Sequence, residues 1–249
     1  MKISIITVVY NNEFTIREAI ESVLKQTYSS IEYVIIDGKS KDNTVSIIEE
    51  YKERLGYFSS QSDRGLYDAM NKGIAASTGD VIGILNSDDL YQDDNVILDV
   101  MSQFNSDSTL DIVFGDLVYV KKDNIEHIVR NWKSKSYYPK FFDQGNVPPH
   151  PSLFLKKSVY NKVGLFNLDF RLAADYEFML RVFKKYNFKS KYINRLIVKM
   201  RLGGETNKSV SNILNQNKEI VKAWEYNNLS APYLLMPYRI VKKVLQFIK

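Results

Sequence analysis

The chain has 249 residues, of which 45% are hydrophobic and 25% are charged, and its formal net charge is +5. These values are typical of a globular protein with one large α/β domain, or with one domain and appendages. The absence of cysteine excludes disulfides, zinc–thiolate sites and thiol nucleophiles, and the presence of only two histidines argues against a His-rich metal site.

Strands and helices alternate along the first 90 residues. A nearly continuous apolar run from Ile3 to Tyr10 predicts a central strand of a parallel sheet rather than a signal peptide, whose apolar core would be longer. Apolar residues at helical spacing predict a helix from Phe14 to Leu24; the same patterns predict strands at 32–36, 57–60 and 81–85 and helices at 42–54 and 66–76. This alternation predicts a right-handed, doubly wound, mostly parallel α/β sheet flanked by helices.

The pattern changes after residue 90. We expect a helix at 96–104, a hairpin of strands 112–120 and 125–130, a strand at 152–155, a helix at 174–186 and closing helices at 209–225 and 233–248. The polar, aromatic segment 132–149 between them is a candidate substrate flap. No run is long enough to cross a bilayer as a helix, so we expect a cytoplasmic protein.

Two adjacent carboxylates, Asp88 and Asp89, follow the apolar run at 81–85. Two carboxylates at the open end of a strand can hold a hard divalent cation such as Mg²⁺ or Mn²⁺, although Asp-Asp is also common in a capped turn. Polar side chains stand at three other predicted strand ends, in the segments 10–11, 37–40 and 63–65. Ligands of open α/β sheets bind at this edge, so we expect these four segments to form one crevice.

Two common nucleotide motifs are missing from this chain. The first predicted strand is followed by Tyr10-Asn11-Asn12-Glu13 instead of G-x-G-x-x-G, and no G-x-x-x-x-G-K-[ST] run occurs. If a nucleotide binds, its phosphates therefore are not cradled by a glycine loop, and a metal held by Asp88 and Asp89 is the natural counter-charge.

Four segments together resemble the family 2 glycosyltransferases of the GT-A fold: Val8–Asn11, Ile35–Thr44, Ser62–Gly73 and Leu85–Asp89. The resemblance covers roughly residues 1 to 205, and the run Asp63–Gly73 resembles the branch that builds bacterial O-antigen and capsule repeats. It implies an inverting transfer of a sugar from a nucleoside-diphosphate donor, most simply a UDP-sugar, usually with Mg²⁺ or Mn²⁺. It also implies a nucleotide-binding half at 1–90, an acceptor half at 91–205 and a C-terminal helical extension at 206–249.

The resemblance assigns donor-binding roles to four residues. Val8 and Tyr10 match positions that line the nucleobase pocket, and Asp37 matches the residue that hydrogen-bonds the base edge. Arg64 matches a position that contacts the donor, where a guanidinium can clamp a diphosphate. The alternatives are a turn residue for Asp37 and a surface residue for Arg64, and Asn71 in the same run is expected to position its helix.

Asp88 and Asp89 match the D-x-D region that bridges metal, ribose and pyrophosphate. Asn86 stands where that motif has its first Asp, which lowers the negative charge of the predicted metal site.

An inverting transfer also needs a base that takes the proton of the acceptor hydroxyl. The segment 171–181 resembles the family's E-D-x-D-L-x-x-R region, in which Asp175 falls on the catalytic Asp and Ala174 replaces the preceding Glu. Asp175 is expected near a helix N-terminus, which favours an anion but is also where a plain N-cap would stand. Glu177 is the second candidate for the base, and His150 is a candidate on the acceptor side or a structural residue. The segment 203–206 resembles a loop that closes over the donor phosphates, with a simple turn as the alternative.

The C-terminal segment 233–249 is predicted to form a basic amphipathic helix. Such a helix either lies in the interface of an anionic membrane, which suits a polyprenyl-diphosphate-linked acceptor, or docks on the protein's own surface. The apolar face consists of Tyr238, Ile240, Val241, Val244, Leu245, Phe247 and Ile248. The opposite, polar face consists of Arg239, Lys242, Lys243, Gln246 and Lys249.

Three other functions fit the sequence less well. The basic residues form no stripe across the predicted crevice, which is itself acidic, so we expect no nucleic acid. A nucleotidyltransferase that makes sugar nucleotides would share the sheet and the metal but would need a glycine-rich first loop. A non-catalytic nucleotide-sugar or glycan-binding module would keep the crevice and lack the base.

Overall fold

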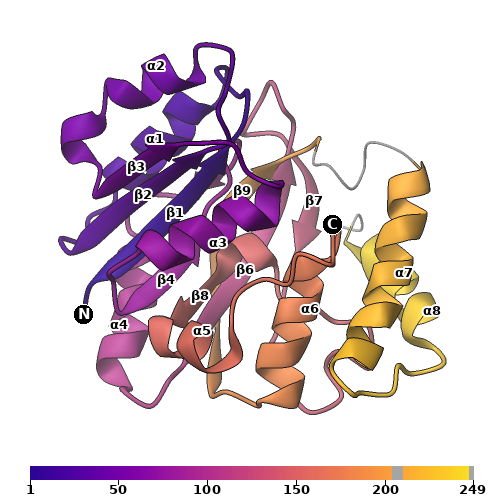
Figure 1. Cartoon of the computed structure of the whole chain (residues 1–249). Helices are drawn as coiled ribbons and strands as arrows, with labels where there is room; N and C mark the ends of the chain where they lie inside the picture. The colour runs from indigo at the N-terminus through magenta and orange to yellow at the C-terminus, as the bar shows by residue number, and fades with distance from the viewer. Residues whose placement is uncertain (204–209, 247–249) are drawn as a thin grey trace.

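The computed structural model describes residues 1–203 and 210–246, and within them nine strands form one sheet in the order β3-β2-β1-β4-β8-β6-β9-β5, with β7 paired to β6 (Figure 1). The N-terminal half matches the predicted alternation and confirms the doubly wound α/β fold. Its strands run parallel to one another, as the buried runs predict. The elements are β1 (Ile3–Val9), α1 (Ile16–Leu24), β2 (Ile31–Asp37), α2 (Thr44–Glu49), β3 (Tyr57–Ser60), α3 (Leu66–Ala76) and β4 (Val81–Ile84).

The predicted helix 42–54 is shorter than expected. It ends at Glu49, and a separate 3₁₀ turn, Lys52–Arg54, follows. The amide of Tyr51 bonds the carbonyl of Ile48, three residues back, at 3.0 Å. This tighter spacing ends the α-helical hydrogen-bond ladder.

The second half of the sheet is mixed. Strand β8 lies antiparallel between β4 and β6, whereas β9 runs parallel to β6. The sequence patterns did not predict β5, α5 or the long strand β9. The elements are β5 (Leu90–Tyr91), α4 (Val96–Ser106), β6 (Ile112–Val120), β7 (Ile128–Trp132), β8 (Leu153–Lys156), α5 (Lys157–Val163), α6 (Ala174–Leu180) and β9 (Ser190–Arg201).

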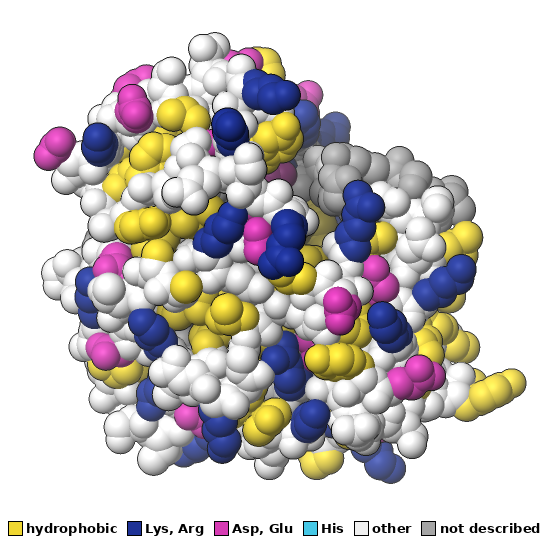
Figure 2. Space-filling model, in the orientation of Figure 1, with side chains coloured by type: hydrophobic (Ala, Val, Ile, Leu, Met, Phe, Trp, Pro, Cys, Tyr) yellow, Lys and Arg dark blue, Asp and Glu magenta, His cyan; other side chains and the backbone are white. Residues whose placement is uncertain are grey.

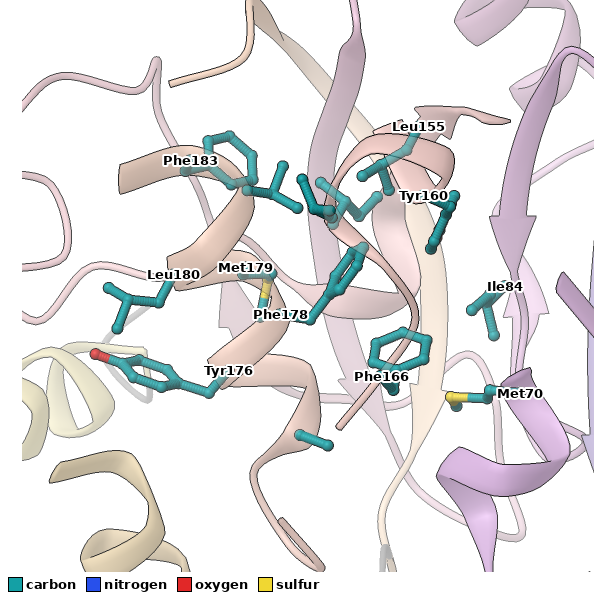
Figure 3. Close-up of a cluster of buried hydrophobic side chains, with 14 of the residues drawn as sticks. Met70, Ile84, Leu155, Tyr160, Phe166, Tyr176, Phe178, Met179, Leu180 and Phe183 are labelled. Carbon is teal, nitrogen blue, oxygen red and sulfur yellow. The ribbon is translucent and has the colours of Figure 1, made fainter. Parts of the chain in front are cut away.

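Helices cover both faces of the sheet with separate hydrophobic cores. Residues of α1, α2 and α4 pack on one face, and residues of α3, α5 and α6 pack on the other. Figure 3 shows Phe178 of α6 beside Phe166, and their ring centroids are 4.8 Å apart. Gly73 allows α3 to approach β1, because a Cβ at this position would stand 2.4 Å from Cγ2 of Ile6.

Two predicted segments differ in the α6 region. The predicted helix 174–186 is an α-helix only to Leu180 and continues as a π-helical turn, Arg181–Lys185. The predicted substrate flap 132–149 is anchored in its middle, since Phe141 and Phe142 are buried in the core that also contains α6. That part of the segment is therefore not a free flap.

The helices α7 (Val210–Tyr226) and α8 (Leu235–Leu245) stand beside α6, at the end of the molecule away from α1 and α2 (Figure 1). Trp224 of α7 is buried in the same core as α6. One side of α8 docks on the domain: a Cβ at Gly145 would stand 2.7 Å from the amide nitrogen of Arg239, and Asn131 of β7 donates its amide to the carbonyl of Gln246 at 3.0 Å. None of the described helices is long and apolar enough to cross a membrane.

Candidate active site

Loops after β1, β2, β3 and β4 meet at the carboxyl edge of the parallel half of the sheet. The amide of Asn11, after β1, donates to Oγ of Ser40, after β2, at 2.8 Å. The side chain of Asn12 donates to Oγ of Ser87, after β4, at 2.9 Å. Asp63, after β3, also lies here, since a Cβ at Gly38 would stand 2.6 Å from its Oδ2. The structure therefore brings together all four segments that the sequence places at strand ends.

The predicted nucleobase residues lie in one cluster but differ in exposure. Tyr10 is 58% exposed, with its ring beside Gly38, whereas the side chain of Val8 is buried in the core, so only the backbone of Val8 could contact a ligand. Asp37 is buried and accepts hydrogen bonds from the amide of Ser40 at 2.9 Å and from Oγ of Ser60 at 2.6 Å. Tyr10 is thus the side chain that is free to stack on a base.

The predicted diphosphate contact, Arg64, lies at the rim of the crevice. Its side chain is 77% exposed and pairs with Asp68 one helical turn later, at 3.3 Å. Asp68 is mostly buried but also pairs with Lys72 at 3.4 Å, so the exposed guanidinium can leave Asp68 for a bound anion at small cost.

The two candidate metal ligands have different surroundings. Asp89 is 0% exposed and is held at both oxygens, by the side chain of Asn86 at 2.8 Å and by the amide of Arg201 at 3.2 Å. Asp88 is partly buried, and no side-chain hydrogen bond or ion pair to its carboxylate occurs among the described residues. Burial raises the pKa of Asp88, and burial together with the charge of Asp88 raises the pKa of Asp89 well above its usual range. Arg201 and Lys122 act on Asp88 through their charges, but no side chain pairs with its carboxylate among the described residues, and such a carboxylate fits a cation.

Asn86 therefore stabilises the turn at 86–89 and is not itself placed as a metal ligand. It donates to Asp89, and Arg201 of β9 donates Nη1 to the carbonyl of Asp88 at 2.8 Å and also pairs with Glu18. Residues 1–203 and 210–246 contain no group of three or more acidic or histidine side chains that could hold a metal by themselves. A cation at Asp88 would need ligand oxygens from a bound molecule, as Mg²⁺ commonly takes from phosphates.

Asp175 lies in the first turn of α6 and faces α3. Tyr67 of α3 donates its hydroxyl to Oδ1 of Asp175 at 3.0 Å. Burial, and then the charge of Asp175, raise the pKa of Tyr67 well above its usual range, so this hydroxyl remains a donor. His150 is close enough for the charge of Asp175 to act on it, but burial is the larger effect and lowers the pKa of His150, which favours a neutral ring at pH 7.

The second candidate for the base, Glu177, points away from solvent. It is fully buried, accepts from Nη2 of Arg181 at 3.0 Å and accepts from the side chain of Asn227 at 3.0 Å. Of the two carboxylates, the geometry favours Asp175, because an acceptor hydroxyl must reach the base.

Asn71 positions its helix, as the sequence predicts. Its side chain donates to the carbonyl of Phe166 and accepts from the amide of Phe166, each at 2.9 Å. This reciprocal pair fixes α3 to the segment that leads toward α6. The loop predicted to close over the donor phosphates, 203–206, lies outside the described residues except for Gly203.

Sequence reasoning did not assign a role to Tyr67, Arg201 or Glu219. Tyr67 stands inside the motif 62–73, but its partner is 108 residues away. Glu219 of α7 binds the segment before α6 through its side chain. The one signal in the sequence is the pair Ala173-Ala174, which begins a helix without the polar cap that helices prefer.

Comparison with known proteins identifies the family and the fold. The family model described as glycosyl transferase family 2 matches residues 4–163. An uncharacterized glycosyltransferase of Mycobacterium tuberculosis is 30% identical over 184 residues, which cover 72% of this chain and 68% of the relative. A PGL/p-HBAD biosynthesis glycosyltransferase of Mycobacterium bovis is 26% identical over 208 residues, which cover 82% of this chain and 78% of the relative.

Two solved structures have a similar fold. TarS of S. aureus, residues 1–349, has a TM-score of 0.67 at 15% identity, with 97% of this chain and 71% of that chain covered. The mannosyltransferase PcManGT from Pyrobaculum calidifontis, in complex with GDP-Man and Mn²⁺, has a TM-score of 0.63 at 16% identity, with 97% of this chain and 73% of that chain covered. The family match spans more than half of the residues, and the chain therefore belongs to glycosyl transferase family 2, with a GT-A fold.

Proposed function

We propose that this glycosyltransferase moves a sugar, with inversion, from a nucleoside-diphosphate sugar to a hydroxyl of a glycan or lipid-linked glycan. The observation that carries the proposal is the 3.0 Å hydrogen bond from Tyr67 to Asp175. Tyr67 belongs to a segment at the donor edge of the sheet, whereas Asp175 belongs to the opposite half of the chain. The bond therefore sets a candidate base beside the crevice, where a direct displacement needs one.

The proposed donor is a UDP-sugar. Tyr10 supplies an exposed ring for the base, and Arg64 can turn to the diphosphate. TarS has been solved with UDP and with UDP-GlcNAc, and PcManGT with GDP-Man, so two nucleosides occur in proteins of this fold. UDP is the first choice, because the UDP-bound TarS is among the structures with the higher TM-scores.

The proposed cofactor is Mg²⁺ or Mn²⁺ at Asp88. The partly buried carboxylate of Asp88, which pairs with no side chain among the described residues, supports a divalent cation there, and Asp89 holds the turn in place through Asn86 and Arg201. When bound, the cation would stabilise the negative charge that develops on the leaving diphosphate. PcManGT, which has the same fold, was solved with Mn²⁺.

The proposed proton transfer uses the chain's own groups. The acceptor oxygen forms its bond to the anomeric carbon from the face opposite the leaving group while Asp175 takes the proton. The bond to the nucleoside diphosphate breaks in the same step, and Arg64 stabilises the departing anion. Tyr67 holds the carboxylate of Asp175 in orientation by its hydroxyl.

The proposed acceptor carries an anionic group, as a polyprenyl-diphosphate-linked sugar of surface-polysaccharide assembly does. Arg239 of α8 lies 4.9 Å above the ring of Tyr176, the residue after Asp175. Burial, and then repulsion by Arg130 and Arg239, lower the pKa of Lys243, also on α8. Arg239 is close enough for the charge of Asp175 to act on it, and a cation beside the candidate base favours an anionic acceptor.

The outer face of α8 is the proposed membrane contact. Its inner side is docked on the domain, but Ile240, Val241, Val244 and Leu245 are 51–62% exposed. Figure 2 shows hydrophobic and basic side chains interspersed on the surface of the α7–α8 side. This combination suits the surface of an anionic bilayer, such as the inner face of the cytoplasmic membrane.

Replacing Val241 and Val244 with Glu is expected to abolish sedimentation of the protein with phosphatidylglycerol vesicles, because both apolar contacts are lost and like charges face the lipid. The change Leu98→Glu on α4, which is equally on the surface, serves as the control. Equal sedimentation of the double variant and the wild type would show that α8 is not the contact.

The function is tested by incubating the protein with a panel of nucleoside-diphosphate sugars, with Mn²⁺ or with EDTA, and by measuring released nucleoside diphosphate and thermal stabilisation. We expect one donor, of the UDP class, to stabilise the protein and to be consumed only when Mn²⁺ is present. Stabilisation by a donor that is never consumed, even with glycan acceptors, would indicate a binding module.

A further inference from the structure

One side chain of the C-terminal extension holds the backbone in front of α6. Glu219 of α7 accepts three backbone hydrogen bonds, from the amides of Arg171 at 3.1 Å, Leu172 at 2.8 Å and Ala173 at 2.8 Å. Gln216, one turn earlier on α7, donates to the carbonyl of Leu172 at 3.3 Å. These α7 side chains therefore bind both the donors and an acceptor of this short segment.

The three hydrogen bonds to Glu219, which we call the Glu219 clamp, hold the segment before a helix that has no side-chain cap of its own. The N-cap position of α6 is Ala173, whose side chain cannot accept a hydrogen bond, and no side-chain cap is made there. The amides at the start of a helix need an acceptor, and Ser, Thr, Asp or Asn normally provides it. Glu219 does not replace that cap: it accepts the amides of Arg171, Leu172 and the N-cap residue Ala173, and so fixes the chain where it enters the helix, 46 to 48 residues before Glu219.

Helix α7 and the residue that follows it also contact α6 just beyond Asp175. Trp224 of α7 donates its indole N–H to the hydroxyl of Tyr176 at 2.9 Å, and Asn227 donates to Glu177 at 3.0 Å. Asp175 thus stands between two groups of contacts with α7 and the residue that follows it, at 171–173 and at 176–177, while its own carboxylate accepts from Tyr67. The position of Asp175 is set by α7 through its neighbours.

We propose that Glu219 is a positioning residue for the transfer reaction. By fixing the three amides before α6, it holds the carboxylate of Asp175 at hydrogen-bond reach of the acceptor hydroxyl and in contact with Tyr67. This inference rests on the proposed role of Asp175 as base. It gives the C-terminal extension a part in the catalytic centre besides the proposed membrane contact.

The expected size of the effect follows from geometry. A displacement of about 1 Å in a reacting group can lower a rate about 100-fold. Glu219→Ala removes both acceptor oxygens, and with them all three hydrogen bonds, and should lower kcat about 100-fold, whereas Glu219→Gln keeps one acceptor oxygen and should lower kcat less. The donor crevice lies on other elements, so KM for the donor should change less than twofold.

The test measures kcat and donor KM of the full-length wild type, Glu219→Gln, Glu219→Ala and Asp175→Asn, and follows hydrogen exchange at the amides of 171–173. Glu225→Ala, an exposed carboxylate on the same helix, is the matched control and should behave as the wild type. In Glu219→Ala the three amides should exchange faster, and in Glu219→Gln the amides that lose their acceptor should do so. In both variants kcat should fall while donor KM stays constant.

Each other outcome overturns a specific statement. Faster exchange with kcat within twofold of the wild type would show that Glu219 has only a structural role, and unchanged exchange would show that the clamp is not formed. A parallel loss of donor binding would mean that the variants damage the whole site. Retained transfer by Asp175→Asn would instead remove the base of the proposed function, so the two failures are told apart.

Discussion

Replacing Asp175 with Asn is expected to lower kcat for sugar transfer about 1,000-fold, within the range that general-base catalysis contributes. The amide has nearly the same shape and can still accept the hydroxyl of Tyr67, which donates to Oδ1 at 3.0 Å. It cannot take the proton of the acceptor. Nucleoside-diphosphate binding, measured by titration calorimetry, should stay within twofold of the wild type. The donor segments follow strands β1 to β4, whereas Asp175 lies on α6.

A surface carboxylate of the same type provides the control. Asp169 is exposed six residues earlier, so Asp169→Asn should leave transfer unchanged. Loss of nucleotide binding in Asp175→Asn would show that Asp175 belongs to the donor site. Transfer at the wild-type rate would show that another group takes the proton.

Replacing Asp88 with Asn has the second large expected effect, on metal-dependent binding of the donor. The carboxylate is the charged group left to a cation, and the loss of one charged contact costs about 2 kcal/mol or more, which is about 30-fold in Kd. Titration of the nucleotide in the presence of Mn²⁺ measures this loss. Binding in EDTA, weak in the wild type, should change little.

The stability of the metal-free protein should move the other way. Burial raises the pKa of Asp88, which means that the fold disfavours its ionised form at neutral pH. Removing that charge should therefore raise the thermal midpoint in EDTA while abolishing stabilisation by Mn²⁺. Asp94→Asn, at an exposed position nearby, should do neither. Mn²⁺ stabilisation that persists in Asp88→Asn would place the cation elsewhere.

The parallel half of the fold could be predicted from the sequence because its signals are local. Strand β1 is buried along its whole length, so it is a continuous apolar run, and turn residues mark its end. Strand β9 was missed because lysine, asparagine and arginine interrupt its apolar residues and much of it is only half-buried. Its place is fixed by pairing with β6 and β5, which no local pattern reveals.

For the site, too, only the part with local signals could be predicted from the sequence. Motifs at strand ends meet because parallel strands end at one edge, so the donor cluster around Tyr10 and Asp88 follows from the alternation of elements. What surrounds each carboxylate did not follow. The bond from Tyr67 to Asp175 joins residues 108 apart, and the bond from Arg201 to Asp89 joins residues 112 apart. Such partners depend on how the two halves of the chain pack.

The roles of individual site residues, and the division into halves at 1–90 and 91–205 with an extension at 206–249, stay predictions. The contacts of α7 bear on that division. Glu219 bonds the segment before α6, and Trp224 and Asn227 bond α6 itself. We therefore propose that the extension folds together with the acceptor half as one unit.

The anomeric configuration of the product tests the central claim most directly. With an α-linked nucleoside-diphosphate sugar as donor, nuclear magnetic resonance of the transferred sugar gives the configuration from the coupling at the anomeric proton. A single displacement, in which Asp175 takes the acceptor proton, predicts a β-linked product. An α-linked product would contradict that mechanism and with it the assignment of Asp175 as the base.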